Sequence, residues 1–168
     1  YILLIASAVA LVIGIGLSTR TTFIGTIIIV AATQPFMAAV ISEFIPDTPL
    51  APLLFAGSGS ALIWFSLRNI GLRFVARAAG AVSILIAAIA FSTWDSNLWR
   101  PLVGFAIVGL LFIFGANRMH LEIVAAGGLG VTVVTGVLAG QLFDSALAQG
   151  ISVIGVGALI VFTSIAIS

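Results

Sequence analysis

Long apolar runs, separated by short polar turns, determine what this 168-residue chain can fold into. Charged and turn-forming residues interrupt the sequence at intervals close to the roughly 20 apolar residues that a helix needs to cross a bilayer. Inside lipid the backbone must satisfy its own hydrogen bonds, so such runs form helices. We therefore predict seven transmembrane helices, at residues 1–18, 22–43, 49–67, 71–92, 98–116, 121–142 and 146–167.

The composition indicates that lipid surrounds these helices. Hydrophobic residues make up 62% of the chain and charged residues 7%, against about 45 to 50% and about 25% in soluble domains. The runs are apolar on every side, whereas helices of a soluble bundle have a polar outer face. We expect an all-α integral membrane protein, a seven-helix bundle in a single transmembrane domain. Because the chain opens on Tyr1 without a signal-peptide flank, we also expect a further N-terminal segment.

The charged residues are divided unequally between the two sets of connections. One set has a single acid among five arginines: Glu122 with Arg20, Arg68, Arg73, Arg77 and Arg118. The other set has a single arginine among four acids: Arg100 with Glu43, Asp47, Asp95 and Asp144. Basic connections stay in the cytoplasm. We therefore expect a plasma membrane protein, in the inner membrane of a bacterium, with its N-terminus outside and its C-terminus in the cytoplasm.

A turn in which Asp precedes Ser or Thr occurs three times, at Asp47, Asp95 and Asp144, each time between two apolar runs. Shifting the sequence by 49 residues sets Asp95 on Asp144 and, weakly, aligns the flanking helices. The first turn aligns as well once Pro46 is treated as one inserted residue and a short deletion is allowed in the next helix. We predict about three parallel two-helix hairpin repeats, preceded by one N-terminal helix. The Asp side chains are interpreted as caps at the outer face, accepting from free N–H groups of the returning helix. An acidic ring that captures cations is the alternative.

Polar side chains inside the membrane are candidates for function because they are costly there. In the 49-residue register Gln34, Ser83 and Thr132 fall at equivalent positions, each near the middle of its helix. They would either bond between helices or line a polar path. Pro35 removes a helix amide, so we expect a kink beside Gln34.

A run of small residues marks the centre of the third helix: Gly57, Ser58, Gly59 and Ser60. Such a segment allows a neighbouring helix to approach closely, or unwinds and offers carbonyl groups to a solute. We expect close packing here. We interpret the GxxxG pair Gly136 and Gly140 as a second internal packing site.

Four arginines are candidates for contacts with anionic lipid headgroups: Arg68, Arg73, Arg77 and Arg118. Arg77 could instead form a salt link with Glu122, or extend to the interface. His120 is the chain's one histidine and there is no cysteine. Because zinc needs three or four such ligands, we expect neither a metal nor a cofactor.

The sequence disfavours several classes of function. A net charge of +1 offers no basic surface for nucleic acid. No acid lies at the midplane, where an intramembrane protease or an ion-coupled transporter would need one, so we do not expect an enzyme. We expect a non-catalytic, helix-packing subunit or membrane domain of a larger assembly, with lipid and other membrane subunits as partners. The alternative is a passive channel or transporter for a small or amphipathic solute; a lipid-acting enzyme is a distant third.

Overall fold

The structure is a computed structural model that describes residues 2–18, 22–44, 48, 50–67, 73–94, 97–143 and 149–158. These residues are helical except for a few at the connections. The helices are α1 (Ile2–Ser18), α2 (Thr22–Phe44), α3 (Leu50–Ser66), α4 (Arg73–Thr93), α5 (Trp99–Arg118) and α6 (Leu121–Leu142). A shorter apolar helix follows at Gln149–Ala158. The prediction of an all-α chain is confirmed for the described residues, and each end of α1–α6 lies within two residues of the expected position.

Within the described part, three helices are long and apolar enough to cross a membrane. They are α4, α5 and α6, with 21, 20 and 22 residues and mean hydropathies of 2.1, 1.8 and 2.0. At 1.5 Å per residue such helices extend about 30 Å, which matches the hydrocarbon core of a bilayer. The described apolar stretches of α1, α2 and α3 are shorter, at Ile5–Leu17, Ile27–Ile41 and Ala51–Ser66.

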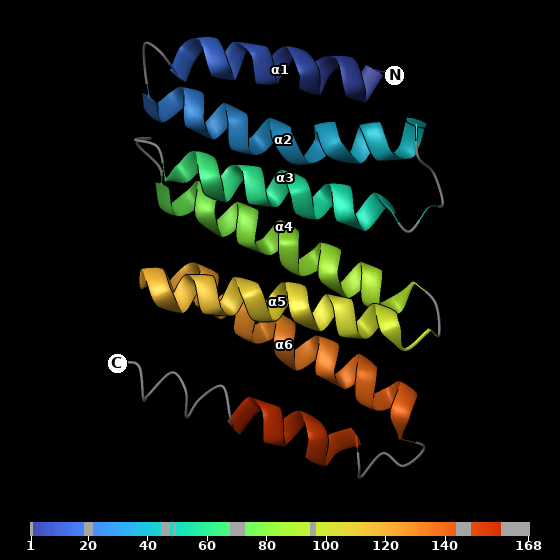
Figure 1. The fold of residues 1–168 in the computed structure, drawn as a ribbon. Coiled ribbons are helices and arrows are strands. Elements are labelled where there is room, and N and C mark those ends of the chain that lie inside the picture. Colours follow the sequence, from blue (N-terminus) through green and yellow to red (C-terminus); the bar gives the residue numbers. More distant parts are fainter. Residues whose placement is uncertain are drawn as a thin grey trace. The chain divides into compact units, whose positions relative to one another are not determined.

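The chain divides into two compact units, Tyr1–Ile84 and Leu85–Ser168. In the first unit, α1, α2 and α3 follow one another as antiparallel neighbours joined by short connections (Figure 1). In the second unit, α5 and α6 form an antiparallel hairpin (Figure 1). The boundary falls inside α4, so the two halves of this helix pack in different units.

Glycines set how closely the helices of the first unit approach. A Cβ atom on Gly14 of α1 would lie 3.0 Å from side-chain carbons of Ile28 and Ile29 on α2. Where α3 meets α4, a Cβ on Gly59 would lie 2.5 Å from the carbonyl oxygen of Gly80, and the reverse substitution is equally close. Small residues at this crossing therefore allow backbone-to-backbone contact.

The second unit packs through a regular seam. The buried residues of α5 alternate in steps of three and four: Pro101, Gly104, Val108, Leu111 and Gly115. This is the spacing of helices that pack as in a coiled coil. Val108 contributes to a core with Ala88, Val131 and Val134. On α6, a Cβ on Gly127 would lie 2.6 Å from the backbone of Phe112, so this glycine too admits a neighbouring backbone.

The buried faces of α4 and α6 do not follow the 49-residue register. Gly80 and Ile84 are buried in α4, whereas the residues 49 positions later, Leu129 and Val133, are exposed on α6. Equivalent residues of a structural repeat would be expected to face the same way. The repeat therefore stays a prediction from the sequence alone.

Candidate functional site

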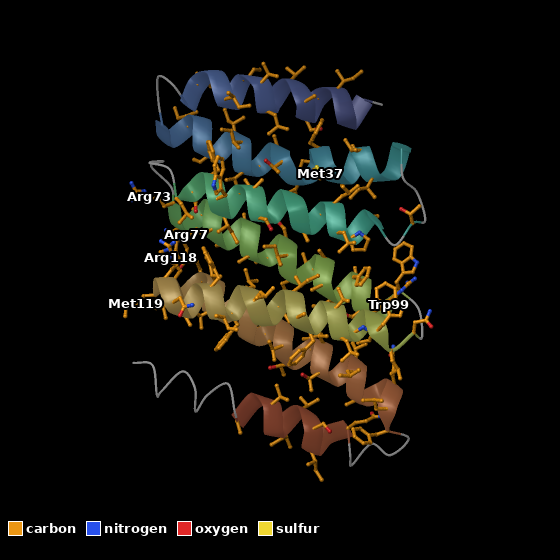
Figure 2. The ribbon with its side chains drawn as sticks, in the orientation of Figure 1. Met37, Arg73, Arg77, Trp99, Arg118 and Met119 are labelled. Atoms are coloured by element: carbon orange, nitrogen blue, oxygen red, sulfur yellow. The ribbon has the colours of Figure 1, made fainter. Side chains whose placement is uncertain are left out.

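The first unit brings together two of the three polar residues predicted to share one level. The amide Nε2 of Gln34 on α2 donates a hydrogen bond of 2.5 Å to Oγ of Ser83 on α4. The Ser83 hydroxyl in turn donates to the carbonyl oxygen of Ala79, at 2.7 Å, within its own helix. Ser83 is only 3% exposed. Met37, one turn beyond Gln34 on α2, marks this region in Figure 2.

Thr132, the third predicted member, belongs to α6 in the second unit. Its Oγ1 donates to the carbonyl oxygen of Gly128, at 3.0 Å, one turn earlier in the same helix. This hydroxyl therefore satisfies its hydrogen-bond donor locally.

Gln34 also has an acceptor that the described residues leave unused. Its Oε1 atom is enclosed and accepts no hydrogen bond there. The next residue, Pro35, lies inside α2, which continues as a helix on both sides. Because proline lacks an amide N–H, the carbonyl group of Ala31 has no helix donor at this position. The Oε1 atom of Gln34 and the carbonyl oxygen of Ala31 are therefore two acceptors, about one turn apart on α2, without a donor from the helix backbone.

The small-residue run of α3 has a packed side and an outer side. Gly59 and Ser58 are buried, and the Ser58 hydroxyl bonds the Phe55 carbonyl group at 2.7 Å. Gly57 and Ser60 are exposed, and a Cβ on Gly57 would meet nothing within 4 Å. The helix continues through the whole run, without unwinding. Close packing is thus found at Gly59 and not at Gly57.

The GxxxG pair of α6 does not mark a close contact among the described residues. A Cβ on Gly140 would meet nothing within 4 Å, and one on Gly136 would make an ordinary 3.6 Å contact with Val153. The close approaches that the sequence analysis missed lie elsewhere: at Gly80, Gly104, Gly115, Gly127 and Gly130. On α5, Gly104 and Gly115 belong to a three-and-four spacing of buried residues along one helix face, which a search for GxxxG pairs does not detect.

The three predicted Asp caps, Asp47, Asp95 and Asp144, lie outside the described residues. At the one neighbouring helix start that is described in detail, α5, the N-cap residue is Leu98 and no side chain caps the helix. Pro52 and Pro101 are both buried and both occupy the third position of their helices, α3 and α5. A proline in a first turn removes an amide that has no helix partner.

Three of the four candidate lipid-binding arginines are described, and Arg68 lies outside the described residues. Arg73 begins α4 and is exposed, and Arg77 follows one turn later, half-buried; Figure 2 shows both at this end of the helix. Arg118 ends α5, with its guanidinium 5.9 Å from the centre of the Phe114 ring. The predicted salt link of Arg77 with Glu122 would join the two units and stays a prediction.

A cation and two aromatic rings gather where α4 leads into α5. The rings of Phe91 and Trp99 meet edge to face, with centres 5.5 Å apart. The guanidinium of Arg100 lies 5.5 Å from the Trp99 ring and 5.9 Å from the Phe91 ring. Trp99 and Arg118 mark opposite ends of α5 in Figure 2. This cluster depends on the turn that returns the chain, so the sequence alone did not indicate it.

Among the described residues, no group of three or more His, Asp or Glu side chains is placed to hold a metal ion. Comparisons with protein-family models, with curated proteins and with solved structures found no match for this chain. Its function therefore has to be inferred from its own chemistry.

Proposed function

We propose that this chain is an integral membrane protein that crosses the bilayer seven times, with its arginine-rich connections in the cytoplasm. The exposed apolar side chains support insertion. Val12, Leu110 and Ile154 are 70%, 67% and 73% exposed, and they come from α1, α5 and the helix at Gln149–Ala158. Removing one such side chain from water contributes about 1.5 to 3 kcal/mol. Insertion into lipid would remove these side chains from water without a further protein surface.

Within the membrane, the chain acts as a non-catalytic helix-packing subunit or membrane domain of a larger assembly. One observation carries this proposal: the hydroxyl groups inside the helices bond to carbonyl groups of their own helix. This holds for Ser58, Ser60, Ser83, Ser92, Thr132 and Thr135. Donors used in this way offer little to a passing solute, whereas close glycine contacts favour a tightly packed scaffold.

Gentle detergent extraction and purification test the subunit proposal. We expect a second membrane protein to co-purify in fixed stoichiometry. Mass photometry and peptide identification would measure the ratio. Recovery of this chain alone, from membranes in which it is expressed at its natural level, would contradict the proposal.

A passive channel or transporter is the second candidate, and the unused Oε1 atom of Gln34 beside Pro35 favours it. Acceptors without a helix donor, like those beside Pro35, resemble the carbonyl groups that transporters offer to substrates. In reconstituted vesicles, Gln34→Leu would then lower solute flux at least tenfold, whereas Ser60→Ala, on the outer side of α3, would not. If the chain only packs helices, no variant carries flux and Gln34→Leu changes the unfolding free energy by less than about 1 kcal/mol.

A further inference from the structure

The turn between α5 and α6 presents two apolar side chains that the proposed packing role does not use. Met119 and Leu121 are 84% and 80% exposed, the highest values among the large apolar side chains of the described residues. Figure 2 shows Met119 beyond the end of α5, at the end opposite Trp99. Grouped apolar side chains with this exposure mark contact with another surface. We therefore expect the pair to meet a surface outside the second unit.

The backbone of the turn holds Met119 outward on a closely packed support. Among the described residues, Met119 is the one non-glycine residue with a positive φ. The amide of His120 donates to the carbonyl oxygen of Gly115 at 2.9 Å. A Cβ on Gly115 would lie 2.7 Å from the amide nitrogen of Val124, so the start of α6 packs directly on the end of α5. A methionine at a position where glycine is common indicates a role for its side chain.

Leu121 is the first residue of a stripe of exposed apolar residues along α6. The members follow one another at intervals of four residues: Leu121, Ala125, Leu129 and Val133. Each step of four residues turns the direction by only about 40°, so the stripe forms one slowly winding face. Since α6 is long and apolar enough to cross a membrane, this face contacts lipid if the chain is inserted as proposed. Leu121 then continues the lipid-facing side to the end of the helix.

The length of α5 places the turn at the level of the lipid headgroups. The 20 residues from Trp99 to Arg118 extend about 30 Å, which matches the hydrocarbon core of a bilayer. Tryptophan favours the membrane interface, and Trp99 is 52% exposed. With Trp99 at one interface, Arg118 reaches the other, where its charge complements lipid phosphates. Met119 and Leu121 adjoin Arg118 and therefore lie at that level too.

We propose that the α5–α6 turn is an interfacial anchor, in which Met119 and Leu121 enter the boundary between the headgroups and the acyl chains of a phospholipid leaflet. The proposal rests on the membrane insertion proposed above. Arg118 lies among the phosphates beside them. The unbranched side chain of methionine adapts to an irregular, mobile surface. Lipid contact thus gives Met119 a role that glycine could not fill.

Spin labels test the depth of the turn. The chain has no cysteine of its own, so Met119→Cys and Leu129→Cys each accept a single nitroxide. Each full chain is reconstituted in vesicles of phosphatidylcholine with phosphatidylglycerol. Power-saturation EPR then compares collisions with oxygen, which concentrates in lipid, and with a nickel chelate, which stays in water.

We expect the ratio of oxygen to nickel collisions at position 119 to exceed that of a free nitroxide in water by at least about threefold. The ratio at position 129, about two turns into α6, should be higher still. If position 119 matches the free nitroxide while position 129 lies in lipid, the turn stands in water and the anchor is wrong. If neither label lies in lipid, membrane insertion fails and the anchor fails with it.

Photo-crosslinking identifies what covers the turn. The chain has two methionines, Met37 and Met119, so Met37→Leu leaves position 119 as the site of incorporated photo-methionine in this sequence. Irradiation of whole membranes, followed by mass spectrometry of the peptide that contains position 119, reports its neighbour. We expect phospholipid adducts to make up most of the product. Adducts to a second protein in their place, or a predominant adduct with water, would overturn the proposal.

Discussion

At the scale of single residues, the position of a glycine on its helix decides its role. Gly57 and Gly59 belong to one run of small residues, yet a Cβ on Gly57 meets open space and one on Gly59 meets the backbone of Gly80. Two residues correspond to about 200° around a helix, so the two glycines face opposite sides. A helix contact between backbones cannot relax by turning a side chain, which makes Gly59 the more sensitive position.

Gly59→Ala should destabilise the protein by about 1 to 3 kcal/mol, because the new methyl group would lie 2.5 Å from the Gly80 carbonyl oxygen. The matched control is Gly57→Ala, which should be neutral or stabilising by up to about 1 kcal/mol because alanine favours the helix. Reversible unfolding in mixed micelles with increasing SDS measures both. Equal stabilities of the two variants would show that the α3–α4 contact is not tight.

At the scale of elements, the hairpin of α5 and α6 closes through an unusual helix end. Met119 adopts the left-handed conformation, with φ of 54° and ψ of 39°. Its amide bonds the Ala116 carbonyl group and the His120 amide bonds that of Gly115, at 3.1 and 2.9 Å. This is a Schellman ending, in which glycine is the common residue. The packing of α5 against α6 fixes the turn at Met119, although the left-handed conformation is unfavourable for methionine.

Met119→Gly should therefore stabilise the protein by about 0.5 to 1 kcal/mol, since glycine adopts positive φ without steric cost. Asn117→Gly, two residues earlier inside α5, should instead destabilise it, because glycine is a poor helix former. Thermal unfolding in detergent would compare the two. If Met119→Gly is the more destabilising variant, the side chain of Met119 contributes more than the strain of its backbone.

At the scale of the whole molecule, arginines and acids are concentrated in alternate connections between the helices. Arg118 ends α5, and the preceding connection contains Asp95. In the first unit, arginines precede α4 while both acids precede α3. Such asymmetry orients a membrane protein because arginine-rich connections are retained in the cytoplasm.

Labelling from the two sides of the membrane tests this orientation. Asn97 and Asn117 are exposed at opposite ends of α5, and the chain has no cysteine of its own. A single cysteine at position 97 should react with an impermeant maleimide added outside intact cells. A cysteine at position 117 should react only after the cells are opened. Labelling of both from the outside would contradict both the orientation and the crossing of α5.

The positions of the helices could be predicted from the sequence, because the length of an apolar run and the residues that interrupt it are properties of consecutive residues. The predicted span at 121–142 coincides with α6, and the largest difference at either end of α1–α6 is two residues. A hydrogen bond between helices was one of the two alternatives that the sequence offered for Gln34 and Ser83, and the sequence did not separate it from a polar path. The aromatic cluster around Arg100 and the tight contact at Gly127 were not predicted.

What the sequence by itself determined is the all-helical fold and the sites where the chain turns. Apolar run length and the placement of charged residues are properties of consecutive residues, and they act whatever the helices pack against. The tertiary structure alone decided which glycines approach a neighbouring backbone, and it separated Gly59 from Gly57. In an apolar helix every face is compatible with burial in lipid, so hydrophobicity does not mark the packed side. The packed side is identified only by the glycines at which two helix backbones approach closely.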